Sequence, residues 1–471
     1  MVKNFPARNI LKVMWLAIAI QVVSGCDPSG KESTENSRAV ASTRPSSLKM
    51  LVVDDSELAK ETGRRWAAEG QFELIVETCT AQEIRDKKFV VDANVDLLVM
   101  PAALEPEFVA ADQLVEIPVH SLESPEFSQG GLLAHFRGNL ATLDERQYSL
   151  PLGAPQAMLL IHESLAKLEG FSPLTWESVK QSLANVDEDK RKIVYPDAGD
   201  WLAWSLLARA ASTVRASNDR SVMFVIETLE PLIDSPGFID ALEKMQAEAA
   251  ALNPDAPRTP NDVFRMVAEG KALAGLGWPN PLGNTGSSGD SIAGVYPWRL
   301  PGSVRRYSRK QSAWFERKPT EQSRFDLFGI DGRCVGVTTA SLHAGTSMEL
   351  AIWMSNKFSN ELCTQSVASG PFRKTHLVKP NLWIGMPVLP DAAEQWASEI
   401  EASHAALLPV VFPPLAGRDE YLAVLASGVR KCLVNEKSAE EALHETSTEW
   451  ASITEKHGVD VQKTRIRWRR P

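Results

Sequence analysis

The stretch Asp262–Asn280, DVFRMVAEGKALAGLGWPN, begins with the pattern of an amphipathic helix. Val263, Phe264 and Val267 have the three- and four-residue spacing of a helix that buries one face. Gly270 follows the last of these apolar positions, where a glycine commonly ends a helix. The sequence therefore predicts a short helix packed on a core and stopped at this glycine.

A strand and an aromatic residue complete the stretch. Residues 272–276 form an apolar run that predicts a buried strand, and Gly277-Trp278-Pro279-Asn280 follows it. A strand that ends at a glycine before an indole can place an aromatic ring at the mouth of a cleft. Burial in a hydrophobic core is the alternative for Trp278, and the stretch alone does not decide between them.

From residue 48 onward, apolar runs alternate with amphipathic segments. Residues 48–53, 72–76 and 96–100 predict strands, with helices between them. The order strand, helix, strand, helix, strand is typical of βαβ units in a parallel sheet. The sequence therefore predicts an α/β fold.

Candidate binding residues follow from this sheet. Ligands of open α/β sheets bind beyond the carboxyl ends of the strands. Asp55 and Ser56 come shortly after the first predicted strand, and Ala102 comes shortly after the third. We expect these three residues to lie at a ligand-binding edge.

Helix starts are predicted in the rest of the chain from capping patterns. A Ser or Thr followed three residues later by Glu forms a capping box, and Ser, Thr and Asp favour the N-cap position. A further apolar segment is expected to be helical. Helices are predicted to open at Thr175, Asp200, Thr346 and Ser438, and to cover residues 222–229.

The first 26 residues have the order of a bacterial lipoprotein leader. Lys3, Arg8 and Lys12 are basic, residues 13–20 are apolar but too short to span a bilayer, and small residues precede Cys26. This order resembles a lipobox and predicts a signal peptide over residues 1–25. The alternative is an ordinary signal peptide with a chance cysteine.

Acylation of Cys26 would anchor the chain to a membrane on the extracytoplasmic, periplasmic side. Residues 26–47 are polar after the cysteine and predict a flexible tether. No later apolar run is long enough for a transmembrane helix. The predicted location is therefore the cell envelope.

The charge of the chain argues against one class of partner. The net charge is −10, and loss of the three leader cations with the signal peptide would make it −13. Nucleic-acid binding needs a basic face. We therefore expect no nucleic-acid partner.

The four remaining cysteines, Cys79, Cys334, Cys363 and Cys432, are far apart and form no CxxC pair. This spacing argues against a zinc site or thioredoxin-like chemistry, so no metal or cofactor is expected. Separate buried thiols and disulfides in an oxidising compartment remain the two alternatives.

Two segments are basic. Residues 303–323 combine six cations with aromatic residues, which predicts either a solvated loop or an anion-binding patch. Residues 463–470 form a basic tail, which is either a frayed terminus or a contact for anionic headgroups.

Catalytic motifs are not found in the sequence. His162-Glu163 lacks the second histidine of HExxH, residues 345–349 do not match GxSxG, and no phosphate-binding glycine loop occurs. We therefore expect no enzyme activity, and a lipid-anchored hydrolase is the less favoured alternative.

Several segments, taken in order, resemble the extracellular solute-binding proteins of family 1, the carbohydrate-type receptors of ABC importers. They include a strand, loop and helix, a hinge crossover that leads into PLTWESV, a Gly-Lys…Gly-x-Trp segment and the closing helices. These segments are Asp96–Pro118, Ser149–Val179, Glu269–Trp278, Gly336–Phe372 and Tyr421–Ile453.

The resemblance implies a two-lobed periplasmic-binding-protein fold of type II, in which each lobe is discontinuous in sequence. Lobe I is expected to comprise residues 48–150 and 334–375. Lobe II is expected to comprise residues 151–333 and 376–461, followed by the basic tail, residues 462–471.

The resemblance also implies a small solute, such as a carbohydrate, held between the lobes for a membrane permease. Trp278 matches the Gly-x-Trp position and is the strongest candidate to stack on a sugar face. Trp201 and Asp55 follow by placement, and Trp298 and Asn280 are weaker candidates. A ligand sensor or a scaffold of the same fold is the alternative function, and the solute is a neutral sugar, an anionic sugar or another molecule.

Overall fold

The computed structural model describes most of the chain, and Arg44–Pro471 forms one compact unit. The predicted signal peptide, Cys26, Asn280 and Cys363 lie outside the described residues. The described residues are 45–137, 142–172, 174–184, 186, 192–215, 221–249, 258–278, 294–318, 320–328, 332–356, 370–380, 388–406 and 409–468.

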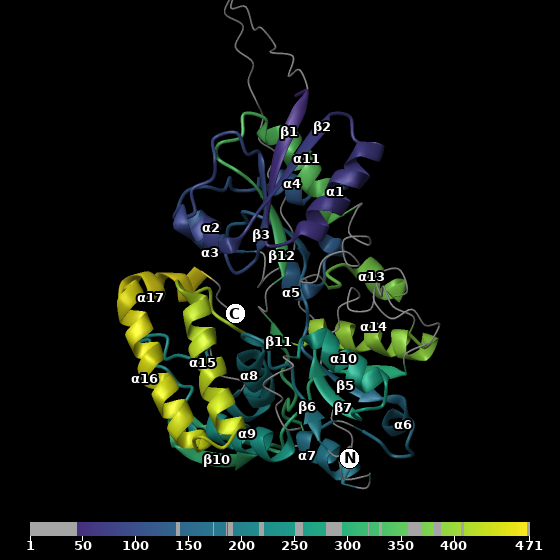
Figure 1. Cartoon of the computed structure of the whole chain (residues 1–471), viewed down its shortest axis with the longest axis vertical. Coiled ribbons are helices and arrows are strands. Elements are labelled where there is room, and N and C mark those ends of the chain that lie inside the picture. Colours follow the sequence, from purple (N-terminus) through teal and green to yellow (C-terminus); the bar gives the residue numbers. More distant parts are fainter. Residues whose placement is uncertain are drawn as a thin grey trace, which may run out of the picture. The chain divides into compact units, whose positions relative to one another are not determined.

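The first sheet has five strands in the order β2-β1-β3-β12-β4 (Figure 1). β1 is parallel to β2 and to β3, which confirms the predicted strands and their βαβ connections. β12 is antiparallel to β3 and β4, so the sheet is mixed rather than parallel throughout. The strands are β1 (Ser47–Val53), β2 (Glu73–Cys79), β3 (Leu97–Pro101), β4 (Leu150–Gly153) and β12 (Arg333–Val337).

Short helices connect and cover the strands of the first sheet. In α1 (Ser56–Glu69), Leu58, Ala59 and Thr62 are buried. Trp66 of the same helix packs its ring on Phe72 and Trp353. The helices are α1 (Ser56–Glu69), α2 (Ala81–Asp86), α3 (Glu105–Ala110), α4 (Val119–Leu122), η1 (Gln129–Gly131), α5 (Ala134–Arg137), α11 (Ala344–Ser355) and α13 (Lys374–Val378).

The second sheet has four strands in the order β6-β7-β5-β8. β6 is parallel to β7, and β5 is antiparallel to both β7 and β8, so β6, β7 and β8 run in the same direction. Their carboxyl ends therefore share one edge of the sheet. The strands are β5 (Met158–His162), β6 (Ile193–Val194), β7 (Ala274–Gly277) and β8 (Val295–Trp298).

The helix predicted before β7 is confirmed as α10 (Pro260–Ala268), with Val263, Phe264 and Val267 buried. It packs closely on the strand, because a Cβ placed on Gly275 would lie 2.6 Å from Cγ1 of Val263. Gly270 has a φ of +66°, which explains why a glycine ends this helix. The two halves of the stretch thus form one helix-on-strand unit.

The other elements lie mostly against the second sheet and its helices. They are α6 (Glu163–Ala166), α7 (Trp176–Leu183), α8 (Trp201–Val214), α9 (Pro236–Glu248), β9 (Arg305–Ser308), η4 (Arg309–Gln311), β10 (Ala313–Glu316), β11 (Leu327–Phe328), α14 (Pro390–Ala405), β13 (Val410–Val411), α15 (Arg418–Leu433), α16 (Ala439–His457) and α17 (Val459–Trp468).

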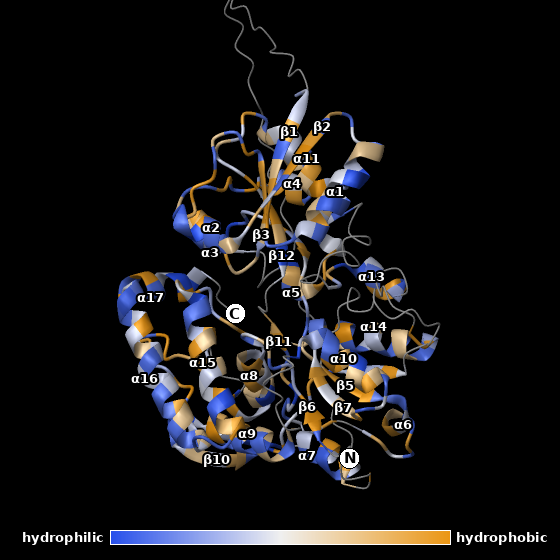
Figure 2. Cartoon of the chain, in the orientation of Figure 1, coloured by the Kyte–Doolittle hydropathy of each residue, from blue (hydrophilic) through white to orange (hydrophobic). Residues whose placement is uncertain are grey.

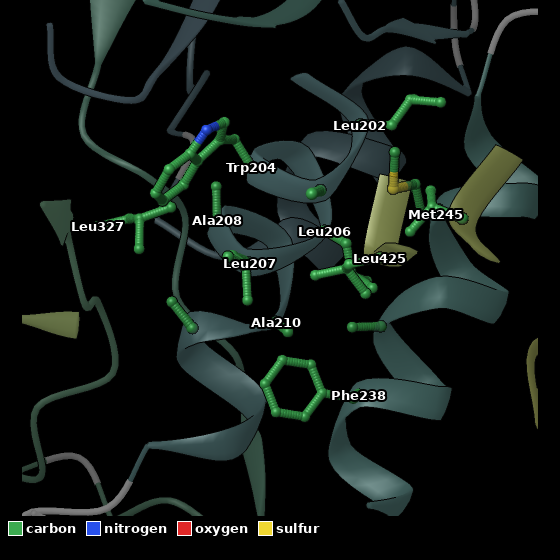
Figure 3. Close-up of a cluster of buried hydrophobic side chains, with 14 of the residues drawn as sticks. Leu202, Trp204, Leu206, Leu207, Ala208, Ala210, Phe238, Met245, Leu327 and Leu425 are labelled. Atoms are coloured by element: carbon green, nitrogen blue, oxygen red, sulfur yellow. The ribbon is translucent and has the colours of Figure 1, made fainter. Parts of the chain in front are cut away.

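Helix α8 is the centre of the larger core. Every residue from Leu202 to Thr213 is buried. Figure 3 shows its apolar side chains beside Phe238 and Met245 of α9 and Leu425 of α15. A helix that is apolar on all sides must lie inside a protein, and Asp200 takes the N-cap position as predicted.

Helices α16 and α17 are mainly hydrophilic, with hydrophobic residues at intervals (Figure 2). The predicted capping box at the start of α16 is confirmed, since Ser438 Oγ accepts from the backbone N–H of Glu441 and the Glu441 carboxylate accepts from the N–H of Ser438. Thr175 caps α7 in the same manner with Ser178.

Two predicted helix features are wrong. Helix α11 begins at Ala344 with His343 at its N-cap, so Thr346 lies inside the helix and does not cap it. Residues 222–229 form turns instead of a helix. The reason is local geometry, because Leu229 adopts a left-handed φ of +64° and Phe224 pairs with Pro231 across the turn.

Both basic segments are more ordered than the solvated loop and frayed tail considered above. In the first, β9 and β10 pair as an antiparallel hairpin. The Arg305 guanidinium bonds to Asp240 at 2.9 Å, and that of Arg317 donates to two carbonyls at the end of α8. Most of the second segment belongs to α17.

Among the described residues, no helix combines the length and apolarity needed to cross a membrane.

Candidate functional site

The loop after β1 uses its carboxylates to hold the fold. Asp54 adopts a φ of +53° and accepts the backbone N–H of Ala81 at 3.0 Å. Asp55 is the N-cap of α1 and accepts the N–H of Leu58 at 3.1 Å. These bonds fix the start of α1 and α2 at the carboxyl edge of the first sheet.

Asp55 also forms a buried ion pair with Arg333 at the start of β12. The Nε of Arg333 lies 3.3 Å from Oδ2 of Asp55, and its Nη2 donates to the carbonyl of Asp54 at 3.0 Å. Their side chains are 3% and 6% exposed. The Asp55 carboxylate is therefore occupied by the protein, whereas Ser56, the first residue of α1, is exposed.

A cavity of about 440 Å³ lies beside the loops that follow β2 and β3. One wall comes from the first sheet's helices and loops, and the other from the C-terminal helices. Ala102 is half-buried next to the lining residue Ala103, and its N–H donates to the carbonyl of Gly332 at 3.0 Å. The lining residues are Gln82, Arg85, Phe89, Ala103, Leu104, Glu107, residues 415–420 and His457.

The charged groups of this cavity pair with one another across its walls. Arg85 of α2 forms an ion pair with Asp419 of α15. Both carboxylate oxygens of Glu107 in α3 accept bonds from Arg465 of α17, at 2.7 and 2.8 Å. The cavity therefore presents oriented polar groups whose charges are largely balanced. This arrangement suits a neutral, hydrogen-bonding molecule.

Glu420 is held as a carboxylate at the same place. Lys456 donates to it at 2.7 Å and its other oxygen lies 2.8 Å from Nε2 of His457. Burial alone would raise the pKa of Glu420, but these hydrogen bonds from α16 lower it below its usual range. The group is therefore an acceptor at neutral pH.

Aromatic residues support the far wall. The Arg418 guanidinium lies over the rings of Trp204 and Phe412, at 5.1 and 5.6 Å from the ring centroids. On the near wall, Phe89 packs edge-on against Phe108 with centroids 5.5 Å apart. Phe89 and His457 are among the residues that line the cavity itself.

Trp278 and Trp298 lie at strand ends of the second sheet, and Trp201 begins α8. Trp201 and Trp278 are in contact, with ring centroids 4.8 Å apart and planes at 45°. Trp278 is 1% exposed, and its Nε1 has no hydrogen-bond partner among the described residues. Trp201 is half-buried at the start of α8. Stacking of a solute on Trp278 would require a neighbouring group to move, and its role in binding stays a prediction.

β7 and β8 are both antiparallel to β5, so they run in the same direction. Trp298 and Trp278 therefore lie at the same edge of the sheet. The ring of Trp298 packs edge-on against Phe171 at 6.1 Å and does not join the Trp201–Trp278 pair. Asn280, the remaining predicted ligand-binding residue, lies outside the described residues.

The three described cysteines form no disulfide. Cys334 and Cys432 are buried and Cys79 is partly buried, and the Cys334 thiol donates to the carbonyl of Met100. Burial raises the pKa of both Cys79 and Cys432 to about 11, so these thiols are protonated and unreactive at neutral pH. No group of three or more metal-binding side chains is present in the described part of the chain.

Sequence reasoning missed most of the cavity. The rule for strand ends led to Ala102 but not to Gln82, Arg85 or Glu107, which lie on the following helices. The signal available for these residues was their position on the first turns after β2 and β3. No local signal connects Arg85 with Asp419, since the pair is 334 positions apart.

No protein-family model and no curated protein sequence matches the chain. Solved structures do match it. A maltose-bound MalE3 of T. maritima aligns with a TM-score of 0.62 and 16% identity, over 86% of this chain and 99% of the other. The sugar-binding protein MalE of Xanthomonas citri aligns with a TM-score of 0.63 and 15% identity, over 87% and 98%.

The chain has a two-lobed periplasmic-binding-protein fold. A solute-binding protein of Agrobacterium radiobacter K84, in complex with ribitol, aligns with a TM-score of 0.63 and 15% identity over 86% of this chain and 98% of the other. The predicted resemblance is thus confirmed at the level of the fold. The cavity of about 440 Å³ has one wall from the helices and loops of the first sheet and the other from the C-terminal helices α15 and α16.

Proposed function

We propose that the chain is a solute-binding receptor that captures a small polyhydroxylated molecule between its two lobes and delivers it to an ABC importer. The observation that carries this proposal is the cavity between α2, α3 and the C-terminal helices. Its volume of about 440 Å³ falls within the range of small-molecule sites, about 300–1,000 Å³. Of the three similar structures, one is a maltose-bound MalE3, one is named a solute-binding protein in complex with ribitol, and one is named a sugar-binding protein.

The chemistry of the cavity supports a neutral solute. Glu107 and Glu420 offer oxygens that accept hydroxyl hydrogens, and Arg85 and Gln82 offer donors. Phe89 supplies an apolar face for the C–H side of a sugar or polyol. Because the cations and anions are already paired, a charged solute would leave one partner unpaired in a partly shielded site.

Binding is expected to raise the melting temperature of the purified chain in the presence of a sugar or polyol, such as maltose, ribitol or mannitol. A ligand at 100 times its dissociation constant adds about 2.7 kcal/mol of stability. Asp419→Asn removes a carboxylate that lines the cavity and the ion pair that orients Arg85, so it should lower affinity by up to about tenfold, the scale of one lost hydrogen bond. Titration calorimetry of both proteins measures the difference.

Trp201→Phe serves as the matched variant for the other candidate position. If the solute stacks at the Trp201–Trp278 pair, Trp201→Phe will weaken binding and Asp419→Asn will not. If no neutral or anionic sugar, polyol or sugar acid shifts the melting temperature, the receptor proposal is wrong.

The membrane anchor is the second part of the proposal and rests on the lipobox pattern before Cys26. Cys26→Ala is expected to move the protein from the membrane fraction to the soluble envelope fraction, because the acyl chains supply the membrane affinity. Cys79→Ala is the control and should leave the protein with the membrane. Retention of the Cys26→Ala protein in the membrane would contradict lipid anchoring at this residue.

A further inference from the structure

Helix α17 is attached to the second lobe along one face. The Gln462 amide accepts from the N–H of Ala416 and donates to its carbonyl, both at 2.9 Å, and also donates to the Tyr421 hydroxyl at 3.2 Å. Gln462 is fully buried, and one turn later Ile466 joins the large core cluster around α8. The helix is thus an integral part of this lobe.

The opposite face of α17 reaches the first lobe. Arg465 donates from both Nη atoms to the two carboxylate oxygens of Glu107, and their side chains are 6% and 20% exposed. Three residues later the carbonyl of Trp468 accepts the backbone N–H of Asp144 at 2.9 Å. The last two turns of α17 therefore bridge the lobes.

Two ion pairs between described residues of the two lobes, Arg85–Asp419 and Arg465–Glu107, differ in strength. Arg85 and Asp419 are 37% and 54% exposed, and an ion pair in water of this kind contributes little. The Arg465–Glu107 pair is bidentate and shielded, and such charge-assisted pairs are the stronger ones. The connection between the lobes beside the cavity is therefore concentrated at Arg465.

Glu107 is also a lining residue of the cavity. The two bonds from Arg465 fix the direction of its carboxylate. The two carboxylate oxygens then present their remaining lone pairs in one orientation. Any molecule that hydrogen-bonds to Glu107 in this cavity meets an acceptor already placed by α17.

We infer that α17 is a strap between the lobes, in which Arg465 positions Glu107 and holds the lobes together before any solute is present. The strap itself rests on the fold, while its effect on affinity rests on the proposed function. A bridge between the lobes shifts the population toward the arrangement in which its partners meet. A binding-competent state that is already populated gives a higher apparent affinity.

Arg465→Met in the full chain tests the strap, with Arg467→Met as the control on the same helix, because Arg467 is exposed. Without any solute, Arg465→Met is expected to increase amide hydrogen exchange in α3 and α17 by about tenfold or more. It should also enlarge the radius of gyration measured by small-angle X-ray scattering. Arg467→Met should match the wild type in both measurements.

A charge swap distinguishes the bridge from a general loss of folding. Glu107→Gln should reproduce the faster exchange, and Glu107→Arg combined with Arg465→Glu should return it toward the wild type. Equal exchange and equal radius in Arg465→Met and the wild type would overturn the strap. Because these measurements need no solute, they stand whether or not a sugar binds. If Arg465→Met raises hydrogen exchange but leaves solute affinity unchanged, α17 still bridges the lobes. In that case Arg465 does not position Glu107 for binding.

Discussion

Arg333→Met is expected to lower the free energy of unfolding by about 3–5 kcal/mol, the range for removal of one partner of a buried ion pair. The substitution leaves the Asp55 carboxylate, 3% exposed, without its guanidinium. It also removes a bond to the Asp54 carbonyl that ties β12 to the loop after β1. Urea denaturation of the wild type and the variant, followed by circular dichroism, gives the difference.

The double variant Asp55→Asn with Arg333→Met is the control. The asparagine oxygen still accepts the N–H of Leu58 and caps α1, but it carries no charge that burial would penalise. We expect the double variant to recover much of the lost stability. A double variant as unstable as Arg333→Met alone would show that the uncompensated charge is not the cause.

The same pair bears on the sequence-based prediction that Asp55 binds solute. Position after a strand end indicates which edge of a sheet a residue lies on, and here that edge does border the cavity. It does not indicate whether the side chain is free. Arg333 lies 278 positions away, so the pair that occupies Asp55 depends on how β12 inserts beside β3, which local sequence does not encode.

Local geometry explains which elements were predictable. The helix α10 and its end at Gly270 follow from apolar spacing and a positive φ, both of which are local properties. The antiparallel insertion of β12 into the first sheet is a long-range pairing. The resemblance grouped residues 334–375 with the first lobe, but it predicted neither the neighbours nor the direction of this strand. Thr346 shows the limit of a capping pattern, because the helix started two residues earlier, at Ala344.

Trp278 shows a different limit. Its place at the end of β7 was predicted, and the structure confirms a strand that ends at Gly277. Whether an indole at a strand end faces solvent depends on what packs over it, and Trp201 of α8 lies against it here. Sequence spacing predicts that Trp278 lies at the edge of the sheet. The burial of its ring depends on α8, which starts 77 positions earlier. The sequence therefore left both positions of the ring open.

Acid is expected to destabilise the fold well above the pH at which carboxylates titrate. His376 and His404 are buried, and burial lowers the pKa of each to about 3, with a smaller contribution from Arg373 and His135 respectively. In the unfolded chain a histidine has a pKa of about 6.5. As the pH falls below 6.5 the unfolded state takes up protons that the folded state does not, so stability decreases between about pH 6.5 and pH 3.

His404 gives the sharper test, because its ring lies among apolar and neutral rings. The ring centroids of Phe328 and His135 are 5.0 and 5.4 Å from its own. A phenylalanine fits these surroundings and cannot be protonated. Each such histidine makes stability fall by up to about 1.4 kcal/mol per pH unit. His404→Phe is therefore expected to reduce the slope of unfolding free energy against pH by up to that amount between pH 6 and 4.

The matched control is His120→Phe, because His120 is exposed on α4. The substitution changes a side chain that the fold does not bury, so this variant should keep the slope of the wild type. Urea denaturation at half-unit steps of pH measures both slopes. A His404→Phe protein with the slope of the wild type would mean that His404 is protonated in the folded state and that its burial does not determine the acid response.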